Sequence, residues 1–527
     1  MSFPRVITGR RRALVAQLVA NGLAQAAAAL AGVQALHASL TAQPANALSL
    51  GALAASGAAL VALRIHAAGV GERLGQDYVT RVRLRIFEAV AARPARGTPN
   101  RAGLTMARVI SDLSSLRSWV SAGIARSLVA GVTLAFALAV LALTRPAAAL
   151  TLGGVALGCA LAAATLAPLL RARVREARRR RGRLANNLGE KLLASNTVRQ
   201  LGQTAAELAR VRTHSGWLRD ALVRRARVAE AMSALPELAT PLAIALWLAL
   251  NGAAHAGELA GGVLMLGVLG AALRDLARAF EHRIAFEEGR RRIAVLLDAP
   301  RLEEKRRAQS LPGRGPLALE FRGASVEGAL RDVNLSAKPG ERVLITGATG
   351  SGKSTLLALA ARLLDPSEGE LRLGDTPLRE LALDAVHEAV QLISPELPLL
   401  RGSVAENVSY AAAEDEPEWI EQVVLACGLA DDPALPEGLA TRIEERGANL
   451  AHGLRARIAL ARALALRPRA LLVDDAAFAQ SAEAAALRSA CALHPMTVLA
   501  VAPEGSTLLA FDREWRLEDG AAREVAR

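Results

Sequence analysis

Lysine, aromatic residues and cysteine are all scarce in this chain of 527 residues. Lysine occurs four times among the 64 Lys and Arg residues, aromatic residues make up 3% of the chain, and cysteine occurs three times. The cysteines, Cys159, Cys427 and Cys491, stand too far apart to suggest a zinc site or a disulfide framework. A small metal-scaffolded or disulfide-rich domain is therefore excluded.

Charge is missing from long stretches of the first part of the chain. No Asp, Glu, Lys or Arg occurs from 13 to 63, a run that is too long for one membrane span and suits two, broken at 43–46. Further runs near bilayer length follow. A buried, all-helical soluble domain is the alternative, but the charge of the loops disfavours it. We expect six spans, at about 13–40, 47–68, 120–144, 146–170, 236–255 and 258–280.

The arginines indicate how these spans are oriented. The formal net charge is +14, which invites a nucleic-acid interpretation, but the arginines gather in blocks beside the apolar runs, as in 81–96 and 178–181. The turns at 41–47 and 251–256 carry no Lys or Arg. We therefore expect the blocks and both termini to be cytoplasmic, with no nucleic-acid partner. No clean cleavage site follows the first apolar run, so we expect a retained span and not a signal peptide.

The stretch from Gly347 to Thr355 fits the phosphate-binding loop pattern G-x-x-x-x-G-K-[ST]. A β-branched run at 342–346 predicts a buried strand before it, and good helix formers at 356–364 predict a helix after it. In such a loop the glycines let successive N–H groups face phosphate oxygens, Lys353 reaches the β- and γ-phosphates, and the Ser354 hydroxyl ligates Mg²⁺. We expect ATP contacts from Gly347, Ala348, Thr349, Gly350, Ser351, Gly352, Lys353, Ser354 and Thr355.

Other segments resemble ABC exporters, in which a membrane domain is joined to an ATP-binding domain. The similar segments are 71–76, 83–87, 190–199, 288–298, 330–335 and 402–408. The resemblance implies an all-α six-helix transmembrane domain followed by an α/β P-loop NTPase (ABC-type) nucleotide-binding domain, which together make a half-transporter. We place the domains at 1–298 and 317–527, joined by a linker at 299–316.

The resemblance also assigns two carboxylates after the apolar run 471–473. Asp474 corresponds to the residue that orients Mg²⁺. Asp475 stands where the family usually has the glutamate that polarises the attacking water. One methylene fewer withdraws this carboxylate by about an ångström, a misplacement that can cost about a hundredfold in rate. Asp475 is therefore predicted to be a weakened catalytic base.

The family's LSGGQ signature corresponds to Leu450, Ala451, His452, Gly453 and Leu454. In the family this motif caps the γ-phosphate that is held by the opposite subunit. Ala451 lacks the hydroxyl donor of the family's serine, and its loss costs about 1.5–3 kcal/mol with a charged partner. His452 places a side chain where glycine allows close backbone approach. The signature is thus predicted to be degenerate.

Further family positions are altered as well. Pro395 stands at the Q-loop glutamine and Pro503 at the switch histidine, and proline has neither a side-chain donor nor an N–H. The segment 478–481 lacks the D-loop aspartate. The segment 325–329 lacks the aromatic residue that stacks on adenine in the family, and Phe321 is a poor substitute because it lies several residues before that position. The groups that hold triphosphate and metal remain, while those that complete hydrolysis are altered.

These observations predict an ATP-binding half-transporter that moves an unidentified substrate across the bacterial inner membrane, with slow ATP hydrolysis. In the family each ATP site takes its phosphate loop from one chain and its signature from the other, so we expect a heterodimer with an intact second half-transporter. An ATP-binding regulatory or gating subunit is the alternative, and a homodimeric pump with altered chemistry is a third. The expected cofactors are ATP and Mg²⁺, within a lipid bilayer.

Overall fold

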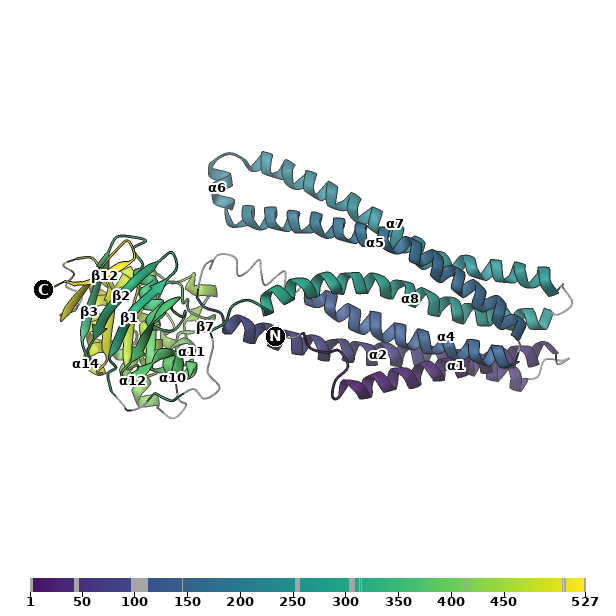
Figure 1. Ribbon diagram of the computed structural model, residues 1–527, viewed down its shortest axis with the longest axis horizontal. Helices are drawn as coiled ribbons and strands as arrows, with labels where there is room; N and C mark the ends of the chain where they lie inside the picture. Colours follow the sequence, from purple (N-terminus) through teal and green to yellow (C-terminus); the bar gives the residue numbers. More distant parts are fainter. Residues whose placement is uncertain are drawn as a thin grey trace. The chain divides into compact units, whose positions relative to one another are not determined.

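The computed structural model describes residues 3–41, 47–95, 112–144, 146–251, 256–302, 309–311, 313, 315–412, 416–504, 506 and 509–525. The chain forms two compact units (Figure 1). The first comprises Met1–Ala91 and Asn100–Ala299, and the second Ala92–Pro99 and Pro300–Arg527. The main part of the second unit begins at Pro300, inside the expected linker, and part of that linker lies outside the described residues.

The described part of the first unit is helical, which agrees with the expected fold class. Its helices are α1 (Arg11–Thr41), α2 (Ala47–Ala91), the π-helical η2 (Trp119–Ile124), α4 (Ala125–Thr144), α5 (Pro146–Leu193), α6 (Ser195–Gln200), α7 (Thr204–Asn251) and α8 (Ala256–Leu297). Among the described residues, four segments are long and apolar enough to cross a membrane: Arg11–Leu40, Ala47–Ala91, Asp112–Thr144 and Gly153–Leu193. The described part of the fifth expected span, 236–251, lies in α7, and the sixth, 258–280, lies in α8. Residues 42–46 and 252–255 lie outside the described residues.

The long helices continue well beyond a bilayer. α2, α5, α7 and α8 have 45, 48, 48 and 42 residues, and at a rise of ~1.5 Å per residue each is about twice the ~30 Å thickness of the hydrocarbon core. α5 and α7 run side by side, and the short helix α6 joins their ends (Figure 1). α5 and α7 thus form a long helical hairpin that α6 closes. Residues 96–111, which follow α2, lie outside the described residues.

Close helix contacts in the first unit depend on small residues. α2 approaches the segment before α4 at Gly71 and Gly75, where an added Cβ would lie 2.8 Å from the Ser121 carbonyl oxygen and the Ser121 Cβ, respectively. The apolar cluster around this contact includes Leu18, Tyr78 and Ile293, all almost fully buried. The helices therefore pack through a dry core as well as through small-residue contacts.

The second unit contains two main sheets. A six-stranded sheet has the order β12-β11-β3-β10-β9-β6, and a four-stranded antiparallel sheet has the order β2-β1-β4-β5. The strands are β1 (Leu319–Val326), β2 (Leu330–Ala337), β3 (Arg342–Gly347), β4 (Glu368–Leu373), β5 (Thr376–Pro377), β6 (Val390–Ile393), β7 (Gly402–Ser403), β8 (Arg442–Ile443), β9 (Ala470–Val473), β10 (Thr497–Val501), β11 (Arg513–Glu518) and β12 (Ala521–Val525). The α-helices are α9 (Lys353–Ala360), α10 (Leu383–Ala389), α11 (Val404–Val408), α12 (Pro417–Ala426), α13 (His452–Leu464) and α14 (Ser481–Leu493).

The predicted strand before the phosphate loop is present as β3, and its four central residues are buried. The predicted helix after the loop differs from the structure, because α9 ends at Ala360 and does not reach Leu364. The cause is Arg362, which has a left-handed backbone with φ of 49°. Its fully buried guanidinium donates to the Leu381 carbonyl oxygen at 2.6 Å, so a tertiary contact overrides helix propensity here.

Candidate nucleotide-binding site

Four parallel strands of the six-stranded sheet end at the same edge. β3, β10, β9 and β6 are successive neighbours and pair in parallel. In open α/β sheets, ligands bind in the crevice outside the carboxyl ends of the strands. The segments that follow these four ends are, in the same order, the phosphate loop from Gly347, Pro503, the Asp474–Asp475 pair and Pro395. The structure thus gathers the predicted site residues of four motifs at one edge.

The phosphate loop depends on glycine at three positions. Gly347, Gly350 and Gly352 have φ of 140°, 87° and 103°, a region that other residues rarely adopt. At Gly347 an added Cβ would lie 2.3 Å from the Leu517 carbonyl oxygen, and at Gly352 it would lie 2.7 Å from that of Ala329. Backbone conformation therefore requires all three glycines, and close approach is a second requirement at Gly347 and Gly352.

Lys353 and Ser354 occupy the first turn of α9, next to its N-cap Gly352. The Lys353 ammonium donates to the carbonyl oxygens of Gly347 at 2.8 Å and Ala348 at 2.7 Å, so the lysine lies across the loop. The partial positive charge of the helix N-terminus adds to that of the lysine. This combination of loop amides, a helix end and a lysine suits a triphosphate.

The residues expected to hold Mg²⁺ supply the oxygen donors that this ion prefers. Ser354 is exposed, and Asp474 is half-buried at the end of β9, where its N–H donates to the Ile393 carbonyl oxygen at 2.8 Å. One hydroxyl and one carboxylate fit Mg²⁺, which is held by one or two protein oxygens together with substrate phosphates and water.

Asp475, the predicted base, is buried, and one of its carboxylate oxygens already makes contacts within the chain. Its Oδ1 accepts from the Ala477 N–H at 2.9 Å and so caps the short 3-10 helix η6 (Ala476–Ala479). The His452 Nε2 lies 3.0 Å from the same oxygen. Sequence reasoning missed this contact, because the two residues belong to separate motifs and nothing local in the sequence pairs them.

The degenerate signature begins helix α13, and Ala451 is the N-cap residue, which makes no side-chain capping hydrogen bond. Gly453 is retained for a reason within this chain. A Cβ added there would lie 2.0 Å from the Glu483 Oε1, so the buried Glu483 carboxylate covers the first turn of the helix. Leu454 is buried in the core beneath.

The remaining altered positions give no functional side chain at the site. Pro395 and Pro503 are both exposed beyond the ends of β6 and β10. Phe321 is 2% exposed and packs edge-to-face on Trp515, with ring centroids 6.0 Å apart. It belongs to the hydrophobic core and has no surface for stacking on adenine.

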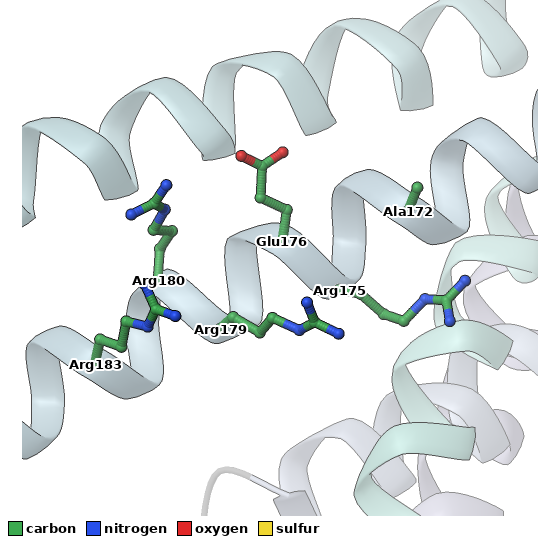
Figure 2. A pocket seen from close by; sticks show the side chains of 6 residues that line it. All are labelled: Ala172, Arg175, Glu176, Arg179, Arg180 and Arg183. Atoms are coloured by element: carbon green, nitrogen blue, oxygen red, sulfur yellow. The ribbon is translucent and has the colours of Figure 1, made fainter.

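Several pockets lie along α5 in the first unit, and two of them differ sharply in character. Figure 2 shows the arginine-rich pocket, of about 330 Å³, lined by Ala172, Arg175, Glu176, Arg179, Arg180 and Arg183. Arg224 of α7 hydrogen-bonds to Glu176 at 2.9 Å, which lowers the pKa of that carboxyl group. The only acidic residue of this pocket is therefore paired with another helix, and the arginines retain an excess of positive charge.

The second pocket, of about 630 Å³, lies between α5, α7 and α8. Small and apolar side chains line most of it, including Ala163, Met232 and Leu273. One cation lines it as well, Arg171, whose guanidinium lies over the Phe280 ring, 5.1 Å from the centroid. An apolar cavity with a single positive charge suits an amphipathic molecule with an anionic group.

Comparisons with known proteins agree with this architecture. Residues 14–267 match the family model of the ABC transporter transmembrane region, and residues 330–477 match that of the ABC transporter. A multidrug efflux ATP-binding/permease protein of Mycobacterium bovis is 33% identical over 291 residues, which are 53% of this chain and 24% of that protein. An ATP-dependent lipid A-core flippase of Chromobacterium violaceum is 29% identical over 376 residues, which are 68% of this chain and 64% of that protein.

The chain therefore matches about a quarter of the length of the mycobacterial relative and under two thirds of that of the flippase. A solved structure of a bacterial Atm1-family ABC exporter with ATP bound has the same fold, with a TM-score of 0.83 at 21% identity over 97% of this chain and 94% of that chain.

This chain belongs to the ABC transporter family. Within it, the chain joins one transmembrane region to one nucleotide-binding domain and has the fold of an ABC exporter. The predicted fold class and family are confirmed. Membership implies ATP as the ligand of the second domain and a lipid bilayer around the first.

Proposed function

We propose that this half-transporter binds MgATP through Gly347–Thr355 and is the hydrolytically weakened subunit of a heterodimeric exporter. The observation that carries the proposal is the contrast at one edge of the sheet. The phosphate loop has the glycine conformations and the lysine that triphosphate binding needs. The neighbouring strand ends present Pro395 and Pro503, which offer no side-chain hydrogen bond.

The geometry of Asp475 adds to this contrast. Its shorter side chain caps η6 through Oδ1 and contacts His452. A base that is set back and held in this way contributes less to activating water. Asp474 and Ser354 would hold Mg²⁺ beside the nucleotide. The chain then binds ATP but hydrolyses it slowly unless a partner chain supplies the catalytic groups that this chain lacks.

The arginine distribution supports a place in the bacterial inner membrane with both termini in the cytoplasm. The pocket in Figure 2 lies along α5 beyond the expected fourth span and is lined by four arginines. Cytoplasmic ends of spans carry such excess positive charge. The nucleotide-binding domain then faces cytoplasmic ATP.

For the substrate, we infer an amphipathic molecule with an anionic group. The apolar pocket with Arg171 at Phe280 has this character, and one relative is named as a lipid A-core flippase. Exchange of Arg171 for Gln should weaken binding of such a molecule and leave ATP binding unchanged.

The proposed weakening is tested by restoring the altered groups together, in a variant with Asp475→Glu, Pro503→His, Ala451→Ser and His452→Gly. Since residues that act as a unit are strongly non-additive, single changes need not help. The combined variant should hydrolyse ATP at least tenfold faster than the wild type, given that each lost transition-state donor costs about 10²–10³ in rate. An unchanged rate in a folded, ATP-binding variant would refute the alignment of these motifs.

An ATP-binding regulatory or gating subunit is the second candidate, because a chain that binds ATP without hydrolysing it can still change shape. An adjacent reading frame that encodes a half-transporter with intact motifs favours the heterodimeric exporter. A folded chain that binds ATP, forms no complex with such a partner and alters the conductance or activity of another membrane protein favours regulation.

A further inference from the structure

The contact between His452 and Asp475 joins two motifs that the sequence keeps apart. His452 is the first residue of α13, and Asp475 follows β9. The Nε2–Oδ1 distance is 3.0 Å, with the Asp475 side chain 6% exposed and the imidazole 48% exposed. The same Oδ1 accepts the Ala477 N–H at 2.9 Å. One buried carboxylate oxygen therefore has donors from two different elements.

The position of His452 is well defined, because the first turns of α13 are anchored below it. Arg457 pairs with Asp432 and donates to the Gly428 carbonyl oxygen at 2.7 Å. Its Nε also lies 3.8 Å from the buried Glu483 carboxylate, which covers the glycine next to His452. The imidazole is thus held against Asp475 by the packing of the whole helix end.

We propose that His452 is a positioning residue that restrains Asp475, so that a hydrogen bond links the signature helix and the base position of one chain. This inference rests on the proposed function, in which Asp475 acts on ATP at the phosphate loop. A base needs a lone pair within reach of the water. Oδ1 accepts the Ala477 N–H and lies 3.0 Å from the His452 Nε2. With a proton on Nε2, both lone pairs of Oδ1 are engaged, and Oδ2 is the oxygen left to reach the water.

The test compares two replacements of His452 in the full chain, purified in lipid nanodiscs. His452→Leu removes the donor but keeps a bulky side chain, so it does not recreate the family's glycine. His452→Gln keeps an N–H donor. Single-turnover hydrolysis of MgATP should be about tenfold faster in the Leu variant, as expected for release of one hydrogen bond to a charged group. The Gln variant should remain close to the wild type.

Two readouts separate positioning from a general structural effect. The Kd for MgATP should be similar in the Leu and Gln variants, since both lack the imidazole of the signature and neither changes the phosphate loop. Amide exchange at Ala477 should be faster in the Leu variant than in the Gln variant, because the carboxylate that accepts this N–H is no longer held. The exchange experiment needs no nucleotide and therefore tests the link even if the proposed function fails.

A double variant with Asp475→Asn tests whether His452 acts on hydrolysis through Asp475. The gain in the Leu variant should disappear in the His452→Leu, Asp475→Asn double variant. A gain that survives Asp475→Asn overturns the proposal, as does a Leu variant that binds MgATP normally with unchanged hydrolysis and unchanged exchange at Ala477. Absence of MgATP binding by the wild type overturns the proposed function instead. If the Leu variant is unstable, His452→Ala gives the same comparison.

Discussion

Exchange of Lys353 for Ala should weaken nucleotide binding by at least tenfold while leaving the fold intact. The ammonium group bonds to two loop carbonyl oxygens, of Gly347 and Ala348, at 2.8 and 2.7 Å. When a triphosphate binds, the group turns to oxygens that carry full negative charge. A hydrogen bond between charged groups contributes about 1.5–3 kcal/mol, and ~1.4 kcal/mol corresponds to a tenfold change in Kd. The expected loss is therefore about 10- to 150-fold.

The effect on stability should be much smaller. Lys353 is only partly buried, and the two bonds that it makes in the free protein are partly replaced by water in the variant. A neutral side chain at this position should lower the free energy of unfolding by about 1 kcal/mol or less. The substitution therefore reports on binding and not on folding.

The assay is a titration of the full chain in nanodiscs with a fluorescent ATP analogue, with and without EDTA. Lys338→Ala is the matched control, because Lys338 lies in the turn before β3 and is exposed. The control should bind like the wild type. Equal affinity for wild type and Lys353→Ala would refute the assignment of the phosphate loop.

Three further predictions concern conformation, pH and topology. Gly352→Ala combines a φ of 103° with a Cβ placed 2.7 Å from a carbonyl oxygen, so it should destabilise the domain by more than ~2 kcal/mol. Gly350→Ala should destabilise it less, because Gly350 has a φ of 87° but no atom within 4 Å of the added Cβ. The reverse order of stabilities in denaturant unfolding would contradict this loop geometry. Burial lowers the pKa of His387 below its ordinary value, so this group binds more protons in the unfolded state than in the folded state. Its contribution to the free energy of unfolding is complete above about pH 6.5 and should fall as the pH drops below that value. Hydrogen exchange in β6 and α10 should therefore accelerate less on acidification in His387→Asn than in the wild type. A cysteine at Ala45 should react with an impermeant reagent from outside and one at Arg180 should not, and the opposite pattern would contradict the arginine-based orientation.

The parts of the fold that were predictable have strong periodic or compositional signals. β3 is predicted as a buried strand, and most of β9 coincides with the apolar run 471–473, because central parallel strands are continuous apolar runs. The phosphate loop was predictable because its backbone allows only glycine at defined positions. Long uncharged runs likewise indicated helices that are long and apolar enough to cross a membrane, and four such segments are present among the described residues.

What the sequence could not predict depends on contacts between distant residues. α9 ends early because the Arg362 side chain is drawn to the Leu381 carbonyl oxygen, and no local propensity signals this. The pairing of His452 with Asp475 follows from the packing of α13 against η6. The contact of the Glu483 carboxylate with Gly453 likewise joins residues 30 positions apart.

The central claim, that this chain binds ATP but hydrolyses it poorly by itself, is tested most directly by its ATPase rate alone and in a complex. The chain should be purified alone and after co-expression with a half-transporter that has an intact signature, glutamate and switch histidine. The proposal predicts a stable one-to-one complex with substantially more activity than either chain alone. A homodimer of this chain that turns over ATP at roughly 1 per second or above, a rate normal for enzymes of this kind, would contradict it.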